Sequence, residues 1–396
     1  MTVEKENTIS FTYIDQLTWL RGIAALFVIV SHTLRATEVK YDQLDKASSS
    51  SILSFFDLGN FGVVLFFALS GCTLFISNSD KVAYNQVVTF YIKRFFRIWP
   101  AFVVSLLFYM LFRLVFAHFY GNSQGFWVEK QFLSSYSISD VLSYISLISN
   151  FTGPDELFNN AFWSLPVEFQ YYLIFPLIIL SLKYVGVIGP VVIGLLIYLL
   201  PKLGLFESND NSLFMLAFSF CGGVIIGYLY KRSSFRFNLK LSMALLVGLL
   251  IIVSAITNSY IRLPDFPIIS TKSNWKILIA LLTIYIVLFT RFNINKKLEV
   301  ILKHYGTISY SNYLYHNLFI GIAVLLIINL EIYDSNLRLF GTLLFTLVAS
   351  QIAATLSYKY VEVPSIALGR AIVGSKKNND SKTVVVSEQK LQQENT

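Results

Sequence analysis

A few ionisable side chains lie inside otherwise apolar stretches of this sequence, and they are the residues best suited to chemistry. Arg21 and His32 lie 11 residues apart in the first stretch. At about 100° per residue, this spacing places both side chains within about 20° of one helix face and about 16 Å apart along its axis. Because histidine titrates near neutrality, His32 is suited to accept and return a proton. In the structural alternative, each side chain reaches a membrane interface.

A carboxylate lies near the start of the fourth apolar stretch. Ser164 is suited to cap a helix there and Pro166 to occupy its first turn, so we expect Glu168 about one turn into the membrane from the outer side. A charge at that depth costs at least about 2.5–3.5 kcal/mol on insertion scales. We therefore predict a catalytic or orienting role for Glu168. An ion pair with Arg113 is the structural alternative.

Two arginines precede the third apolar stretch. Arg94 and Arg97 are three residues apart and share a helix face. A guanidinium group binds phosphate through two parallel hydrogen bonds, which a lysine cannot do. We therefore predict a phosphate-binding site here. The alternative is that both arginines only mark the cytoplasmic side of the membrane.

Three further polar side chains are expected to donate hydrogen bonds to a substrate. Ser70 precedes Gly71 at the end of the second stretch, where small residues let a ligand or another backbone approach closely. Close helix packing is the structural alternative for this pair. Tyr313 and His316 lie three residues apart on one face of the ninth stretch, near the middle of the membrane.

Membrane helices must position these residues. Of 396 residues, 55% are hydrophobic and only 14% are charged, with a mean hydropathy of +0.62, whereas a soluble domain has about 25% charged residues. The sequence predicts an all-α polytopic membrane protein, a bundle of about ten transmembrane helices of about 20 residues each. The predicted spans are 17–34, 58–77, 98–117, 162–182, 184–200, 212–230, 240–256, 275–290, 308–330 and 338–360.

The fourth and fifth spans allow more than one number of crossings. Only Lys183 separates them, and Pro176 should kink the helix that contains it, so nine or eleven crossings are also compatible with the sequence. Residues 131–149 are rich in serine and are predicted to form a helix lying at the membrane surface.

The basic residues set the orientation. With the amino terminus inside, the inner segments contain 20 Lys and Arg residues and the outer segments contain 9, which predicts that both termini are cytoplasmic. We expect a cytoplasmic segment at 1–16, a membrane domain at 17–364 and a disordered cytoplasmic tail at 365–396. Basic residues confined to short segments between apolar runs make nucleic acid an improbable partner, and the oligomeric state stays open. Two cysteines exclude a disulfide framework, and no metal is expected.

Five segments in this order resemble the motifs of the acyltransferase 3 family, over residues 14–364. The first helix matches Arg-x10-His, and residues 62–71 are similar to Gly-Val-x-x-Phe-Phe-x-x-Ser-Gly. Arg94, Arg97 and Pro100 match an arginine-rich motif that ends in proline. Residues 163–168 match Trp-Ser-Leu-x-x-Glu, and 309–316 match Ser-Tyr-x-x-Tyr-Leu-x-His. Pro166 departs from the polar or small residues that are common beside the glutamate.

The resemblance implies a multi-pass enzyme of the inner (plasma) membrane that O-acylates a surface polysaccharide or lipid-linked sugar from cytoplasmic acyl-CoA. It implies no bound cofactor; acyl-CoA is the donor substrate, with acetyl favoured and succinyl also considered. His32 and Glu168 are expected at the reacting centre and Arg94 and Arg97 at the CoA phosphates, with Arg21 in support. Membrane lipid and a glycan acceptor are the expected partners. A flippase of a lipid-linked sugar, or a polysaccharide-export subunit, is the alternative.

Overall fold

The computed structural model describes residues 14–37, 55–79, 84–119, 126–153, 156–203, 212–258, 260–261, 271–332 and 334–374. Within these ranges the chain is almost entirely helical, without a named strand. This confirms the predicted all-α polytopic membrane fold. Residues 1–13 of the predicted segment 1–16, and residues 375–396 of the predicted tail 365–396, lie outside the described residues.

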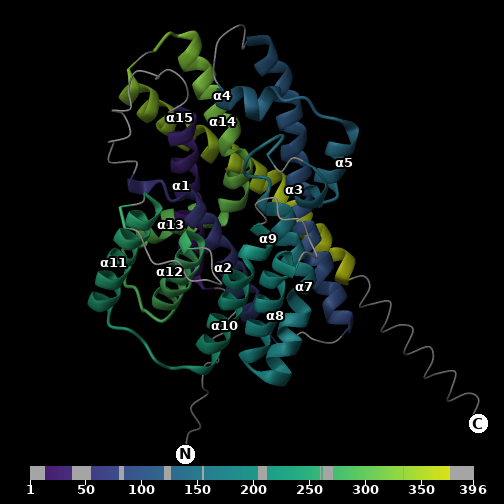
Figure 1. The fold of residues 1–396 in the computed structure, drawn as a ribbon, viewed down its shortest axis with the longest axis vertical. Coiled ribbons are helices and arrows are strands. Elements are labelled where there is room, and N and C mark those ends of the chain that lie inside the picture. The colour runs from purple at the N-terminus through teal and green to yellow at the C-terminus, as the bar shows by residue number, and fades with distance from the viewer. Residues whose placement is uncertain are drawn as a thin grey trace, which may run out of the picture.

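All ten predicted spans coincide with helices, which Figure 1 labels. Eight of these helices are long and apolar enough to cross a membrane, and two apolar helices are shorter. The eight are α1 (Asp15–Thr37), α2 (Gly59–Asn78), α3 (Tyr84–Phe119), α7 (Ser164–Val185), α9 (Ser212–Met215) together with α10 (Ala217–Arg232), α11 (Leu239–Thr257), α14 (Ser309–Asn329) and α15 (Ser335–Ser357). The two shorter ones are α8 (Ile188–Leu199) and the apolar part, Asn274–Leu288, of α12 (Thr271–Leu288).

The fourth and fifth spans are separate helices. Helix α7 continues through Pro176 and ends at Val185. Gly186 follows with φ of 66°, a left-handed conformation that glycine adopts without steric cost. Because α8 begins only two residues later, the two helices turn back on each other as predicted.

Helices α2 and α10 pack backbone against backbone. A Cβ atom on Gly71 would collide with the carbonyl oxygen of Phe220, and one on Gly223 would collide with the carbonyl oxygen of Ala68. Small residues at such crossings let two helix backbones approach closely, which is a main source of packing energy in a membrane. The packing explanation of Gly71 is therefore correct, and it fixes the direction in which its neighbour Ser70 points.

Short helices fill the connection between α3 and α7: α4 (Phe126–Val128), the π-turn η3 (Glu129–Leu133), α5 (Ile138–Ile145) and α6 (Ser149–Thr152). A capping box joins Ser137 and Asp140 at the start of α5. The Ser137 hydroxyl, and then its backbone N–H, hold the pKa of the Asp140 carboxyl below its ordinary value. The predicted surface helix at 131–149 is thus not continuous, and its residues are divided among η3, α5 and α6.

This connection ends against the first turns of α14. Asn159 is fully buried, and its side-chain amide donates to the Leu314 carbonyl at 3.2 Å. Helix α7 therefore begins beside the start of α14. Ser164 is the first residue of α7 and not its cap: its hydroxyl lies 2.7 Å from the hydroxyl of Tyr313.

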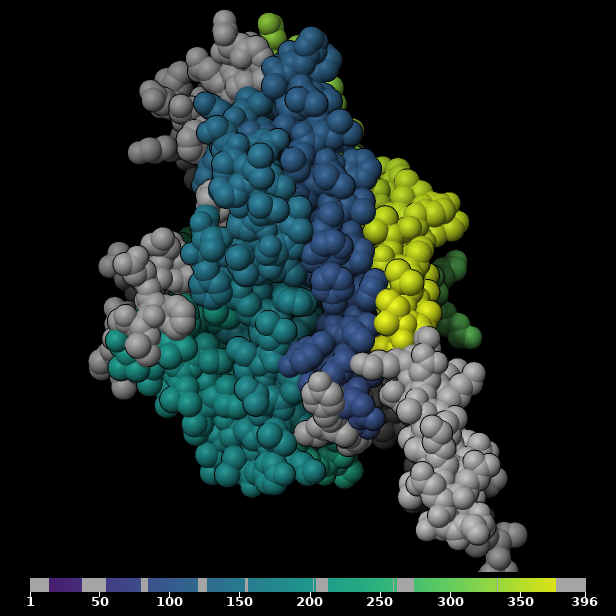
Figure 2. Space-filling model, turned by 90° about the vertical axis from the view of Figure 1, so that its right-hand side faces the viewer, coloured from purple at the N-terminus to yellow at the C-terminus, as the bar shows by residue number. Residues whose placement is uncertain are grey.

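The last helix is longer than predicted. After Ser357 the chain forms a π-turn, η5 (Tyr358–Glu362), and then continues helical to residue 374. The expected disorder from 365 onward is therefore wrong for residues 365–374. In Figure 2 this carboxyl-terminal helix lies along α3, and Gly369 fits against the Phe96 side chain.

The basic loops meet at one end of the bundle. The Lys231 ammonium donates to Ser79 at 2.6 Å, which joins the ends of α10 and α2. Lys303 of α13 (Lys296–Thr307) pairs with Asp15 at 2.9 Å, next to the start of α1. We call this end, which contains residues 231–240 and 291–303, the basic end.

Candidate functional site

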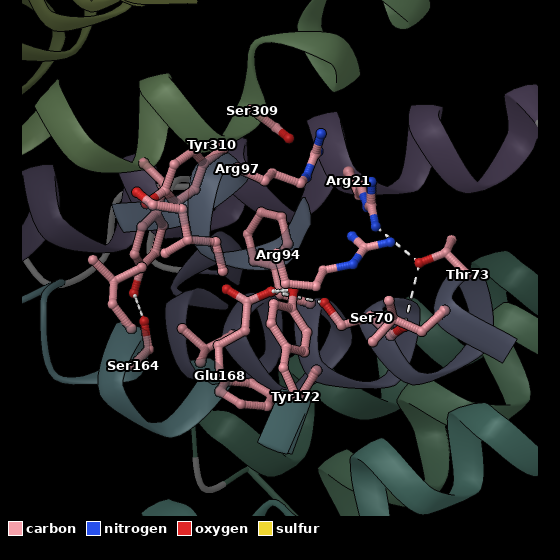
Figure 3. A pocket seen from close by; sticks show the side chains of 17 residues that line it. Arg21, Ser70, Thr73, Arg94, Arg97, Ser164, Glu168, Tyr172, Ser309 and Tyr310 are labelled. Atoms are coloured by element: carbon pink, nitrogen blue, oxygen red, sulfur yellow. Dashed lines mark hydrogen bonds between the residues drawn. The ribbon is translucent and has the colours of Figure 1, made fainter. Parts of the chain in front are cut away.

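A polar pocket lies between α1, α2, α3, α7 and α14 (Figure 3). Its volume is about 80 Å³. A second cavity of about 230 Å³ shares four of its residues and extends to Ile14 and Ser77, near the start of α1 and the end of α2. The two cavities therefore form one cleft that runs inward from the basic end. The polar residues of the inner pocket are Arg21, Ser70, Thr73, Arg94, Arg97, Ser164, Glu168, Tyr172, Ser309, Tyr310 and Tyr313.

Three arginines converge in this pocket (Figure 3). Arg21 donates to the Thr73 hydroxyl at 2.9 Å. The Arg94 guanidinium lies over the rings of Phe90 and Tyr172, at 5.6 and 5.7 Å from the ring centroids. Its Nε is buried and makes no hydrogen bond. A buried guanidinium N–H without a partner is costly, so Arg94 is prepared for an anionic ligand.

Arg97 extends the same site. It lines both cavities and, within the described part of the chain, makes no hydrogen bond or ion pair. Glu168 is the one carboxylate that lines the inner pocket, against three guanidinium groups. The excess of positive charge favours an anion in the cleft.

Glu168 belongs to this pocket and does not contact His32. One carboxylate oxygen accepts hydrogen bonds from the Ser70 hydroxyl, at 3.0 Å, and from the Tyr172 hydroxyl. Arg113 does not pair with it, because the Arg113 guanidinium lies over the ring of Tyr136 and donates to a backbone carbonyl. The structural alternative for Glu168 is therefore wrong.

The depth expected for Glu168 is also corrected. The sequence places Arg94 and Glu168 on opposite sides of the membrane, yet they line one pocket. Helix α3 contains 36 residues, about 54 Å, so Arg94 lies about 15 Å along it from the start. Helix α7 begins beside the first turns of α14. Both effects bring the two side chains to the same level.

The two predicted histidines form a second cluster. His32 Nδ1 lies 2.8 Å from His316 Nε2 and 3.0 Å from the Asn317 side-chain oxygen. The two imidazole rings are nearly parallel, with an angle of 17° and centroids 5.1 Å apart. His316 and Asn317 are fully buried, whereas His32 is partly exposed. Neither histidine lines the polar pocket.

Tyr313 separates the two clusters. Its ring lies 5.9 Å from that of His316, and its hydroxyl, at the inner end of the pocket, donates to the Ala161 carbonyl at 2.8 Å. Arg21 and His32, both on α1, thus belong to different clusters on one helix. From the basic end inward, the arginines come first, and Tyr313 lies between them and the histidine pair.

The three expected substrate donors are already engaged. The Ser70 proton goes to Glu168, the Tyr313 proton goes to Ala161, and His316 Nδ1 faces two backbone carbonyls. In this arrangement these side chains shape the pocket and hold its other members. A ligand oxygen bound here would need one of them to exchange its partner.

Several residues of both clusters escaped sequence reasoning. Tyr172 lies four residues after Glu168, and Asn317 directly follows His316, so helical spacing was the available signal for both. Asn159 carried no periodic signal, because it lies in an irregular connection. Glu362 is 1% exposed, accepts a hydrogen bond from Ser311 and interacts electrostatically with Arg97.

The described residues include no group of three His, Cys, Asp or Glu side chains arranged to hold a metal ion. The fold and site together define a polytopic helical membrane protein with an arginine-lined cleft that leads toward a histidine pair. The chain belongs to the acyltransferase 3 family, because the profile of the family's acyltransferase domain matches residues 14–355. It is therefore a multi-pass membrane protein of this family.

Two curated relatives carry acyltransferase names. An acyltransferase, MdmB, from Streptomyces mycarofaciens is 31% identical over 166 residues, which cover 41% of this chain and 38% of the relative. An O-acetyl transferase from Shigella phage Sf6 is 27% identical over 174 residues, covering 41% of this chain and 45% of the relative. The chain thus matches less than half the length of either relative. No solved structure matches.

Proposed function

We propose that this protein moves an acyl group, with acetyl favoured, from cytoplasmic acyl-CoA to a hydroxyl of a surface polysaccharide or lipid-linked sugar. The observation that carries the proposal is the cleft at the basic end, in which Arg21, Arg94 and Arg97 converge around an unpartnered guanidinium N–H. The name of the phage relative, an O-acetyl transferase, supports oxygen as the accepting atom and acetyl as the group.

Phosphate recognition defines the donor end of the cleft. The CoA phosphates bind Arg94 and Arg97 by charge-assisted hydrogen bonds, each worth about 1.5–3 kcal/mol. Arg21, held by Thr73, adds a third positive charge. The thin pantetheine arm then follows the narrow inner pocket toward Tyr313. Glu168 positions the donor pocket by accepting from Ser70 and Tyr172, whose ring supports Arg94.

His32 is the base in this proposal. Its imidazole takes the proton of the acceptor hydroxyl while the hydroxyl oxygen attacks the thioester carbonyl. The carbon–sulfur bond then breaks, and the CoA thiolate takes the proton back from the imidazolium, so the ester and free CoA leave with all atoms accounted for. Transient acylation of His32 is the other route the chemistry allows.

The acceptor approaches from the end opposite to the arginines. His32 lies five residues before the end of α1, and the next turn, at Arg35, pairs with Asp57 at 3.8 Å near the start of α2. With the basic end cytoplasmic, this face is extracytoplasmic. The protein then resides in the inner (plasma) membrane with both termini in the cytoplasm.

The test uses purified protein in nanodiscs with labelled acetyl-CoA and candidate glycans. The expected result is release of CoA together with labelled glycan. His32→Gln keeps the side-chain size and removes the titratable base, so it should lower the rate about 10²–10⁴-fold. Acetyl-CoA binding should persist, because the arginines lie in the other cluster.

Arg94→Ala should weaken acetyl-CoA binding about tenfold or more. Arg291→Ala is the matched control, since Arg291 is an exposed arginine of the same end that does not line the cleft. Near-normal transfer by His32→Gln at equal protein levels would remove His32 from the reaction. Sugar movement across the nanodisc or vesicle without acyl transfer would favour the flippase alternative.

A further inference from the structure

The inference concerns the proton of the His32 ring and rests on the proposed function of His32 as the base. A neutral imidazole has one N–H and one lone pair, and only the nitrogen with the lone pair can accept a proton. Which nitrogen is free therefore decides which face of His32 can meet the acceptor hydroxyl. Two chains of hydrogen bonds, each beginning at backbone groups, fix the answer.

The first chain runs through His316. Its Nδ1 lies 2.8 Å from the carbonyl oxygen of Tyr313 and 3.2 Å from that of Asn312. A carbonyl oxygen can only accept, so the proton of neutral His316 is on Nδ1 and the lone pair is on Nε2. Since His316 Nε2 lies 2.8 Å from His32 Nδ1, the hydrogen between them belongs to His32 Nδ1.

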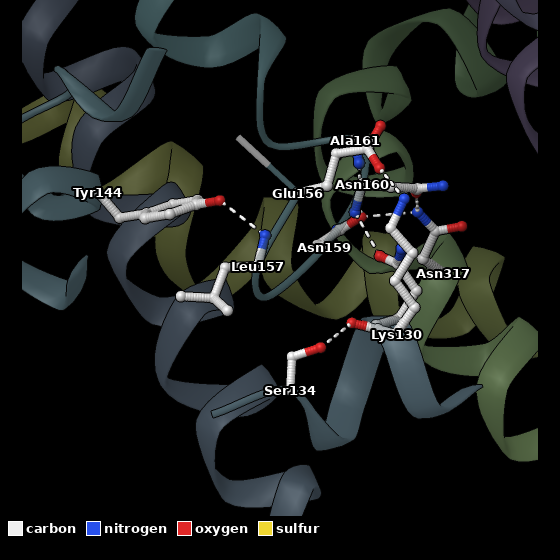
Figure 4. Close-up of polar contacts among 10 residues, drawn as sticks. Lys130, Ser134, Tyr144, Glu156, Leu157, Asn159, Asn160, Ala161 and Asn317 are labelled. Carbon is white, nitrogen blue, oxygen red and sulfur yellow. Dashed lines mark hydrogen bonds and ion pairs between the residues drawn. The ribbon is translucent and has the colours of Figure 1, made fainter. Parts of the chain in front are cut away.

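The second chain runs through two asparagines (Figure 4). The Ala161 N–H donates to the Asn159 side-chain oxygen at 2.8 Å, and the Asn159 amide donates to the Leu314 carbonyl, so the orientation of Asn159 is fixed at both ends. The same oxygen accepts from the Asn317 amide at 2.6 Å. The other end of Asn317, its oxygen, then faces His32 Nδ1 at 3.0 Å and must accept from it.

Both chains place the hydrogen on the same atom. We infer that His316 and Asn317 are positioning residues that hold His32 as the Nδ1–H tautomer, with Nε2 as the atom that receives the proton of the acceptor hydroxyl. When Nε2 is protonated, the Nδ1–H keeps two neutral acceptors, which stabilise the imidazolium. No carboxylate in the described part of the chain hydrogen-bonds to His32, so the orienting role of the aspartate in a serine-protease triad passes here to an imidazole and an amide.

The arrangement connects the base to the segment between α3 and α7. Asn160 also accepts from the Asn317 amide, and its backbone N–H donates to the Gln131 side chain at 2.7 Å. Lys130 pairs with Glu156 at 2.8 Å across the same connection (Figure 4). Asn159 and Asn160 are therefore positioning residues that act on His32 through Asn317. The orientation of His32 thus depends on the conformation of this segment.

The test reads the tautomer directly. The chain has four histidines, so ¹⁵N-histidine NMR of the protein in nanodiscs gives few signals, which His118→Asn and His304→Asn variants assign. The wild type should show His32 with protonated Nδ1 and unprotonated Nε2. Asn317→Leu and His316→Leu should each give a mixture of tautomers, lower kcat at least about tenfold and leave the KM for acetyl-CoA within about twofold.

Two further variants separate positioning from folding. His316→Gln can donate to the Tyr313 carbonyl and accept from His32, so it should keep the tautomer and restore most of the kcat that His316→Leu loses. Asn329→Leu changes an asparagine at the far end of the same helix, where its amide donates to the Leu325 carbonyl, and should change neither readout.

A wild-type His32 with protonated Nε2 would overturn the inference, and so would a retained tautomer and kcat in both leucine variants. If these variants fail to fold, the wild-type spectrum still decides. A wild type that shows the Nδ1–H tautomer but transfers no acyl group would contradict the proposed function and leave the hydrogen-bond assignment standing.

Discussion

Arg94 is held by the faces of two aromatic rings, and this makes the choice of arginine over lysine testable. Stacking on Phe90 and Tyr172 fixes the plane of the guanidinium, and its buried Nε has no partner. A lysine ammonium has neither a planar fork nor an Nε at this position. The side chain is therefore shaped for a planar contact with an anion and not only for positive charge.

Arg94→Lys should raise the KM for acetyl-CoA at least about tenfold, which corresponds to about 1.4 kcal/mol. Orientation in the membrane should not change, because the charge is kept. Titration of acetyl-CoA into the purified variant, together with initial rates, measures the effect. Lys93→Arg on the same helix, outside both cavities, serves as the control. Wild-type affinity in Arg94→Lys would reduce Arg94 to an orientation signal.

At this scale the sequence predicted residue types better than partners. The spacing of Arg94 and Arg97 correctly placed both on one face, since helical periodicity is local. The position of Glu168 beside the arginines depends on where α7 begins, and that is decided by the buried contact of Asn159 with α14. Contacts between helices that are far apart in the sequence leave no periodic signal. The sequence therefore could not show that the site residues form two separate clusters.

Helix packing explains why a pocket residue and a packing residue are neighbours on α2. Gly71 faces α10, and Ser70 faces α7 and Glu168. A rotation of about 100° between consecutive residues gives them different neighbours. Any change that moves α2 relative to α10 therefore also displaces Ser70, so the pocket depends on this helix pair.

Gly71→Ala should destabilise the protein by about 1–3 kcal/mol, because the added methyl group meets the Phe220 carbonyl across a backbone contact that cannot yield. Thermal unfolding in detergent, followed by loss of monodisperse protein, measures the change. Gly248→Ala is the matched control: it lies on α11 with no atom within 4 Å of the added carbon, so stability should stay the same or rise slightly. Equal stability of both variants would contradict the packing.

Element boundaries were predictable where hydropathy alone determines them. All ten spans were found because about 20 apolar residues are needed to cross the hydrocarbon core. The π-turn η5 was not predictable, because it is stabilised by a contact with another helix. The buried carboxylate of Glu362 accepts a hydrogen bond from the Ser311 hydroxyl of α14. The helix therefore continues past residue 364, where the predicted membrane domain ended.

At the scale of the whole molecule, packing determines which segments lie at the same end of the bundle. It does not determine which side of the membrane that end faces. At one end of the bundle, Lys231 in the last turn of α10 contacts Ser79, and Lys303 of α13 pairs with Asp15. The cleft that contains the arginines opens at this end. Whether the end faces the cytoplasm follows from the distribution of basic residues, which is a property of membrane insertion and not of packing.

Single cysteines, introduced into a protein with Cys72→Ala and Cys221→Ala, test both the packing at the basic end and the side of the membrane that this end faces. Cysteines at Lys231 and Lys296, at the basic end, should resist an impermeant thiol reagent in intact cells and react after lysis. Cysteines at Lys130 and Tyr260, which are exposed on other connections, should react in intact cells.

Full inversion of this pattern would place the arginine cleft outside the cytoplasm and remove acyl-CoA as its ligand, because CoA is a cytoplasmic metabolite. Opposite results at Lys231 and Lys296 would contradict the fold itself, since both loops belong to one end of the bundle. Reaction at all four sites in intact cells would mean that the reagent had entered, and a cytoplasmic marker protein labelled in the same cells detects this case.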